Sequence, residues 1–258
     1  MAQWFQTPPG ALLMDQEWRC LEALLEHLFG YHLVQVGCLG TQDTHLTASK
    51  IRSHLLVGES QGSAGMAGQN GRAKRDASHH PSLSWVHSRC NQLPIASDSI
   101  DVVLLPHTLD FSADPHQVIR EVDRILIAEG RVLITTFNPW SLWGLWRLFK
   151  KRGGRVPWCG QFVSYRRVTD WLSLLGFEVE EYRPLMFRPP LNYPKLLNRL
   201  SALDRWGERF WPFFSGVCVI QAVKRVTPLT PRRVTWKLRA RGIGGHVAEP
   251  TTRSSSGG

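Results

Sequence analysis

The sequence contains no two cysteines spaced as C-x-x-C. Its five cysteines are scattered along the chain at Cys20, Cys38, Cys90, Cys159 and Cys218, so they indicate neither a zinc site nor a disulfide framework, and no metal is expected. The chain also lacks the roughly 18 uninterrupted apolar residues of a membrane-spanning helix and the basic and apolar N-terminal segments of a secretory signal. We therefore expect a cytoplasmic protein, either soluble or peripheral to a membrane.

Acidic residues are scarce at the C-terminal end, where most of the formal net charge of +10 lies. Between Lys224 and Gly258 there are eight basic residues and one acidic residue, Glu249. Residues 227–258 are polar and rich in glycine, which predicts a basic, disordered tail. The tail is interpreted as a solubilising segment in preference to a nucleic-acid or anionic-lipid contact. The body lacks a basic groove with interleaved aromatic residues, so nucleic acid is not the expected partner.

Residues 1–226 are long enough to form one domain. Apolar residues recur at helical spacing between Met14 and Gly30, which predicts an amphipathic helix with its stripe at Trp18, Leu21, Leu24, Leu25 and Leu28. The segment 113–130 predicts a second helix, with Asp114 and Gln117 forming a capping box and Gly130 at its end. A third helix is predicted over 165–176, and a weaker helical pattern covers 41–51. Residues 58–82 have no periodicity and repeat glycine, which predicts a flexible insertion.

Seven apolar segments predict strands, at 31–37, 53–59, 83–89, 100–109, 131–139, 177–187 and 216–225. Because strands alternate with helices, we expect an α/β fold with a Rossmann-like, doubly wound, mostly parallel sheet of seven strands. The last strand arrives through a long connection and not through a crossover helix, so it is predicted to be antiparallel.

The order of these motifs resembles the class I S-adenosylmethionine-dependent methyltransferases, specifically the type 11 group. The resemblance runs from about Tyr31 to Arg225 and is most specific in the stretch LPIASDSIDVVLLPHTLDFSADPHQVIREVDRILIAEGRVLITTFNPWS. It implies a transferase that moves a methyl group from S-adenosylmethionine to a small or lipophilic acceptor. The alternative is a catalytically inactive, methyltransferase-like binding or regulatory module.

The first cofactor motif departs from the family pattern, which is close to D-h-G-x-G-x-G with h an apolar residue. In HLVQVGCLG, Gln35 replaces the acid and only Gly37 aligns cleanly, while Gly40 lies one position early. The resemblance implies that Gly37, Cys38 and Gly40 approach the cofactor, although the two glycines would equally make a tight turn.

Two further positions are implied to hold the cofactor. Glu59 lies near the place of the family's ribose-binding acid, and its alternative is a solvated loop residue. In RCNQLPI, Arg89 replaces the acid that accepts from the adenine amino group, so another acceptor such as a backbone carbonyl or Asn91 is needed. Cys90 and Leu93 are expected to flank the base.

Two polar residues follow buried strands and are candidates for catalysis. His107 lies where the family lines its cleft and could act as a base or, alternatively, as a structural or cofactor-backing group. Asn138, in FNPWS, could orient the substrate or only cap the turn before Pro139.

Two tryptophan-rich helical inserts, at 139–160 and 188–214, are expected to cap the domain. The first places Trp140, Trp143 and Trp146 before the basic residues Lys150 and Lys151. Such segments suit a lid over a bulky apolar acceptor or peripheral contact with anionic lipid, and the alternative is packing in the core. The sequence does not specify an oligomeric state.

Overall fold

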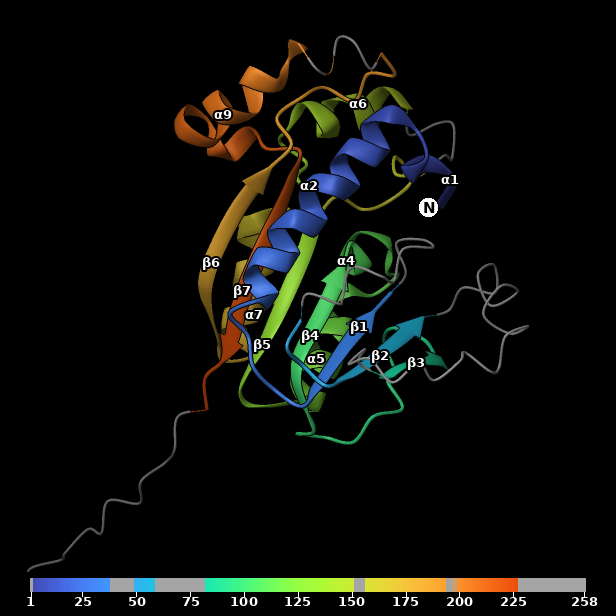
Figure 1. Cartoon of the computed structure of the whole chain (residues 1–258), viewed down its shortest axis with the longest axis vertical. Helices are drawn as coiled ribbons and strands as arrows, with labels where there is room; N and C mark the ends of the chain where they lie inside the picture. Colours follow the sequence, from blue (N-terminus) through green and yellow to red (C-terminus); the bar gives the residue numbers. More distant parts are fainter. Residues whose placement is uncertain are drawn as a thin grey trace, which may run out of the picture. The chain divides into compact units, whose positions relative to one another are not determined.

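Seven strands form one sheet in the order β3-β2-β1-β4-β5-β7-β6 (Figure 1). The computed structural model describes residues 2–37, 49–58, 82–150, 156–193, 197 and 199–226. The strands are β1 (His32–Val36), β2 (Ser53–Gly58), β3 (Ser82–His87), β4 (Ile100–Pro106), β5 (Leu126–Phe137), β6 (Phe177–Leu185) and β7 (Val217–Lys224). Only β7 runs antiparallel to its neighbours β5 and β6. The predicted Rossmann-like sheet, with its antiparallel last strand, is confirmed.

Helices cover both faces of this sheet because its strands are apolar on both faces. The helical elements are α1 (Ala2–Phe5), α2 (Pro8–Leu25), α4 (Thr108–Phe111), α5 (Pro115–Ile125), α6 (Leu142–Lys150), α7 (Tyr165–Leu174), α9 (Ser201–Phe210) and the 3-10 helix η3 (Pro212–Phe214). Helix α2 crosses one face, where the whole predicted stripe from Trp18 to Leu28 is buried with Leu33 and Leu104. Helices α5 and α7 pack with Val34 and Val103 on the other face. Consecutive strand residues enter different cores because side chains alternate across a strand.

The predicted bounds of two helices are wrong. Helix α2 begins at Pro8 and not at Met14, since Pro8 and Pro9 occupy first-turn positions that need no backbone donor. Helix α5 ends at Ile125 and not at Gly130, because Leu126 pairs with Ile100 in the sheet. Gly130 therefore lies inside β5.

The predicted cap at Asp114 is only half of a capping box. Asp114 Oδ1 accepts from the backbone N–H of Gln117 at 3.1 Å, as expected. The backbone N–H of Asp114 donates to Ser112 Oγ at 3.2 Å, so the side chain of Gln117 is not its partner.

Several expectations lie outside the described residues. They are most of the weak helix at 41–51, the insertion between Gly58 and Ser82, and the tail at 227–258. Gly58 and Ser82 themselves belong to β2 and β3. Residues Met1–Val226 form one compact unit. Among the described helices, none is long and apolar enough to cross a membrane.

Candidate functional site

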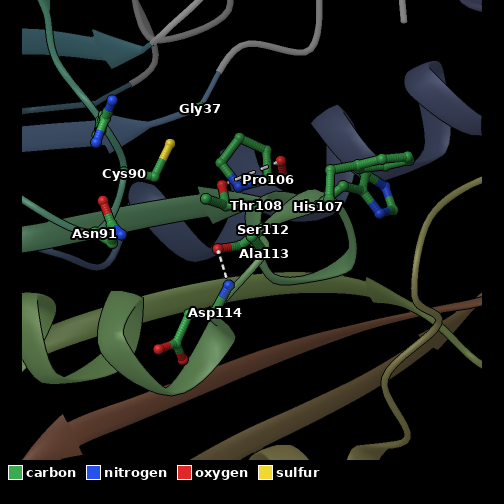
Figure 2. A pocket seen from close by; sticks show the side chains of 11 residues that line it. Gly37, Cys90, Asn91, Pro106, His107, Thr108, Ser112, Ala113 and Asp114 are labelled. Atoms are coloured by element: carbon green, nitrogen blue, oxygen red, sulfur yellow. Dashed lines mark hydrogen bonds between the residues drawn. The ribbon is translucent and has the colours of Figure 1, made fainter.

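A pocket of about 570 Å³ opens at the carboxyl ends of β1 and β4. The chain order of the strands reverses between these two neighbours, which is where open α/β sheets bind their ligands. The volume lies within the range of small-molecule and cofactor sites. The lining residues are Gly37, Arg89, Cys90, Asn91, Pro106, His107, Thr108, Phe111, Ser112, Ala113 and Asp114 (Figure 2).

Gly37 forms the floor of the pocket at the end of β1. Its φ of +89° lies in the left-handed region, and a Cβ atom there would be 2.7 Å from Thr108 Oγ1. The Thr108 hydroxyl donates to the carbonyl of Val36 at 2.5 Å, and the N–H of Gly37 donates to the carbonyl of Val57 at 2.7 Å. Only glycine combines this conformation with this close approach. Cys38, Gly40 and Glu59 lie outside the described residues.

Cys90 and Asn91 lie on the pocket wall that follows β3 (Figure 2). The Oδ1 atom of Asn91 is buried and has no hydrogen-bond partner among the described residues. An unpaired buried acceptor is costly, which makes this atom a place for a donor on a ligand. Arg89, which stands where the family's adenine-binding motif has an acid, also lines the pocket.

Leu93 does not line the pocket. Its side chain is 5% exposed and belongs to the core under α5. Its N–H donates to Glu121 Oε2, and its carbonyl accepts from Arg124. The turn after β3 is therefore fastened to α5, and Leu93 is placed too deep to flank a base.

His107 is one of the residues around the pocket, and its fully buried ring lies between two carboxylates. Nε2 lies 2.7 Å from Glu17 Oε1, and Nδ1 lies 3.0 Å from Asp110 Oδ2. The ring stacks on Phe137 with centroids 4.1 Å apart. Figure 2 shows His107 away from Cys90 and Asn91. Since both ring nitrogens already have partners, no nitrogen is available to take a proton from an acceptor. This geometry fits the structural alternative for His107 and not the base.

The charges in this cluster keep the imidazole protonated. Burial lowers the pKa of His107, but the Glu17 carboxylate and the hydrogen bonds with Asp110 and Glu17 outweigh this effect and raise it to about 9. Burial raises the pKa of Asp110, although its bonds with His107 and with the N–H groups of Phe137 and Val163 oppose that shift. An imidazolium therefore joins α2 to α4 and to the end of β5.

Asn138 lies at the end of β5 and is 7% exposed. Its Nδ2 donates to the carbonyl of Phe213 at 2.6 Å, and its Oδ1 accepts from the N–H of Trp140 at 3.0 Å. The residue does not line the pocket. The geometry matches the capping alternative, with an added bond to the segment before β7.

Two residues of the His107 cluster, Glu17 and Asp110, were not identified as site residues from the sequence. A signal for Glu17 was present, because it occupies a position on the apolar stripe of α2 between Leu13 and Leu21. Within the described part of the chain, no group of three or more His, Cys, Asp or Glu side chains is arranged to hold a metal ion.

Comparisons with known proteins find similar sequences and similar folds. A protein family described as a methyltransferase domain matches residues 34–134, which include β1 and β4. The uncharacterized protein YafS of Escherichia coli is 32% identical over 176 residues, covering 68% of this chain and 65% of its own. The chain thus spans slightly less than two thirds of that relative. Demethylmenaquinone methyltransferase of Chlamydia pneumoniae is 26% identical, covering 61% of this chain and 70% of its own.

Solved structures show the same fold. An S-adenosylmethionine-dependent methyltransferase from Thermotoga maritima superposes with a TM-score of 0.60 at 22% identity. The match covers 86% of this chain and 93% of that protein. At this level of identity the likeness concerns the fold, and the chemistry depends on the pocket residues.

Proposed function

We propose that the chain is a member of the type 11 group of class I S-adenosylmethionine-dependent methyltransferases and that it transfers a methyl group from S-adenosylmethionine to a small or lipophilic acceptor. The observation that carries this proposal is the pocket at the ends of β1 and β4, with Gly37 on its floor and the unpaired Asn91 Oδ1 in its wall.

The described residues fit the cofactor in spite of the altered motifs. Gly37 leaves the end of β1 open to close backbone approach. Asn91 Oδ1 would accept from the adenine amino group, which restores the acceptor that Arg89 cannot provide. Cys90 would lie beside the base. Asn91 thus replaces the acceptor lost at Arg89, while Gly37 and Cys90 keep positions that the family pattern implies.

The cofactor supplies a methyl group that its sulfonium centre already activates, so the protein mainly has to bind, align and exclude water. His107 has a positioning role in this proposal. Its imidazolium fixes the turn from β4 into α4. On that turn, the hydroxyl of Thr108 donates to the carbonyl of Val36 and so fixes the backbone just before Gly37. The backbone of the pocket is thereby set before the ligand arrives.

A small-molecule acceptor is supported by the relative named demethylmenaquinone methyltransferase. It is supported also by the position of Phe111, which lines the pocket and packs against a buried cluster containing Phe137, Trp143 and Trp158. An acceptor entering beside Phe111 would meet apolar side chains.

Asn91→Ala is expected to weaken binding of S-adenosylmethionine and of S-adenosylhomocysteine by roughly tenfold, the loss for one buried hydrogen bond. The measurement is calorimetric titration of the folded protein with each ligand. Asn91→Asp keeps an acceptor oxygen and should retain more affinity than Asn91→Ala.

The matched control is Gln92→Ala, since Gln92 is the exposed neighbour of Asn91 and does not line the pocket. Equal affinities for Asn91→Ala and the control would remove the adenine contact from the proposal. No binding of either ligand to the folded native protein would favour the inactive, methyltransferase-like module.

A further inference from the structure

Helix α6 presents an apolar stripe to solvent. Leu142, Leu145, Trp146 and Phe149 lie on one side of the helix, because the last three come three, four and seven residues after Leu142, and the four residues are between 37% and 79% exposed. Trp143, on the opposite side, is 1% exposed, and its Nε1–H donates to the carbonyl of Arg188 at 2.8 Å. A surface helix of a globular protein normally turns such a stripe inward. Helix α6 is therefore anchored by Trp143, while its other large apolar side chains are exposed.

Helix α9 and the 3-10 helix η3 show the same inverted arrangement. Leu203, Trp206 and Phe210 lie on one side of α9 and are 41%, 64% and 61% exposed. The other side is anchored: Asp204 bonds Arg188 at 2.7 Å, and Gly207 packs against the ring of Phe187. Immediately after α9, the side chains of Trp211, Phe213 and Phe214 are all more than half exposed.

Asn138 links these two segments. One end of its side chain bonds the carbonyl of Phe213, and the other bonds the N–H of Trp140, which is 76% exposed and lies just before α6. Both helices lie at the same end of the sheet (Figure 1). We call the exposed apolar side chains of α6, α9, η3 and Trp140 the aromatic surface; its members are Trp140, Leu142, Leu145, Trp146, Leu148, Phe149, Leu203, Trp206, Phe210, Trp211, Phe213 and Phe214.

Among the described residues of α6, of α9 and just before α9, the exposed charged groups are mainly basic, with Lys150, Arg199 and Arg209 against Glu208. The insert at 139–160 contains five basic residues and no acidic residue, and the insert at 188–214 contains five basic and two acidic residues. One of those two acids, Asp204, is already paired with Arg188. In α6 the exposed basic residue is Lys150 at its end, whereas the guanidinium of Arg147 packs over the ring of the buried Phe162. An occupant of this surface should therefore be apolar where it meets the rings and anionic at its edge.

We infer that the aromatic surface docks the protein on an anionic lipid bilayer, where it would meet a lipophilic acceptor. Tryptophan and phenylalanine inserted at the headgroup boundary, with lysine and arginine beside them, are the chemistry of interfacial helices. Part of this inference rests on the proposed function, because the acceptor would come from the membrane. Trp143 of α6 belongs to the buried cluster against which Phe111 of the pocket packs, so the aromatic surface and the pocket share one core.

The charge pattern favours lipid over a second copy of the chain. The two inserts carry basic residues in excess, so two copies facing each other would bring like charges together. Anionic headgroups attract the same basic residues and so strengthen binding to the membrane.

The test is co-sedimentation of the full chain with phosphatidylcholine vesicles, with and without phosphatidylglycerol. The native protein should bind the anionic vesicles, and added salt should weaken binding. The double variant Phe149→Ser with Trp206→Ser should bind at least about tenfold more weakly, because partition follows the apolar area inserted. The control is Phe29→Ser with Leu174→Ser, which removes side chains that are 73% and 77% exposed outside the aromatic surface. All of these proteins keep every basic residue and the C-terminal segment.

Equal vesicle binding by the double variant and its control would overturn the inference. So would a native dimer in light scattering that the double variant, but not the control, converts to a monomer. Titration with S-adenosylmethionine, on the same samples without vesicles, separates the two proposals. Cofactor binding without vesicle binding removes the membrane surface alone, whereas vesicle binding without cofactor binding removes the proposed transferase and leaves the docking surface.

Discussion

Gly37→Ala should weaken the affinity for S-adenosylmethionine by roughly a hundredfold, or about 2.7 kcal/mol. The φ of +89° at this residue strains any side chain, and the new Cβ would lie 2.7 Å from Thr108 Oγ1. Relief requires Thr108 to turn away, which breaks its bond to the Val36 carbonyl, or requires the end of β1 to move into the pocket. Either change alters the backbone on which the cofactor would lie. Calorimetric titration measures the loss.

Gly176→Ala is the matched control for this substitution. Gly176 has a φ of +82°, so alanine meets nearly the same backbone strain, but its Cβ would have only the carbonyl of Arg225 nearby, at 3.5 Å. Both variants should lose roughly 1–2 kcal/mol of stability to backbone strain, Gly37→Ala somewhat more because of its contact with Thr108, and only Gly37→Ala should lose cofactor affinity. A similar affinity in the two variants would show that the floor of the pocket does not contact the ligand.

The free energy of unfolding should fall by about 2 kcal/mol between pH 7 and pH 9 through His107 alone. The pKa of this histidine is raised from 6.5 to about 9 by its carboxylate neighbours in the folded protein. A raised pKa in the folded state means that the stabilisation is complete below about pH 6.5 and is lost as the pH rises through about 9. Urea unfolding at several pH values across this window measures the slope.

The variant Glu17→Gln tests whether Glu17 causes this pH dependence of the free energy of unfolding. The amide keeps an oxygen to accept from the imidazole and removes the charge that raises the pKa of His107. The variant should therefore lose its stability at lower pH than the native protein. Identical pH profiles for the two proteins would mean that Glu17 does not hold His107 protonated.

Most of the fold could be predicted from the sequence because local patterns and tertiary packing agree. The stripe from Trp18 to Leu25 lies on the buried face of α2, Leu28 is buried just after the helix, and each of the seven apolar segments overlaps one of the seven strands. The end of α5 could not be predicted, because helical spacing continues past Ile125 while Leu126 pairs with Ile100. Sheet pairing overrides local propensity at this position.

The candidate site was less predictable from sequence. Gly37, Cys90 and Asn91 lie in motifs whose spacing survives their changed residues, and the structure places them around one pocket. His107 was identified, but its partners were not: Glu17 is separated from it by 90 residues, and no local pattern specifies that contact. The tryptophan-rich inserts illustrate the same point, since composition alone does not distinguish the buried Trp143 from the exposed Trp146.

The bond between Glu17 and His107 also determines the shortest fragment of this protein that would keep the pocket intact. The family match begins at residue 34, downstream of the whole of α2. A fragment cut at that boundary would keep the imidazole ring and Asp110 but discard the carboxylate that lies 2.7 Å from Nε2. It would also uncover Val102 and Leu104, which α2 buries. Any chimera that preserves the pocket must therefore include the chain from Pro8 onward. Helix α2 is thus part of the domain that has to be transferred.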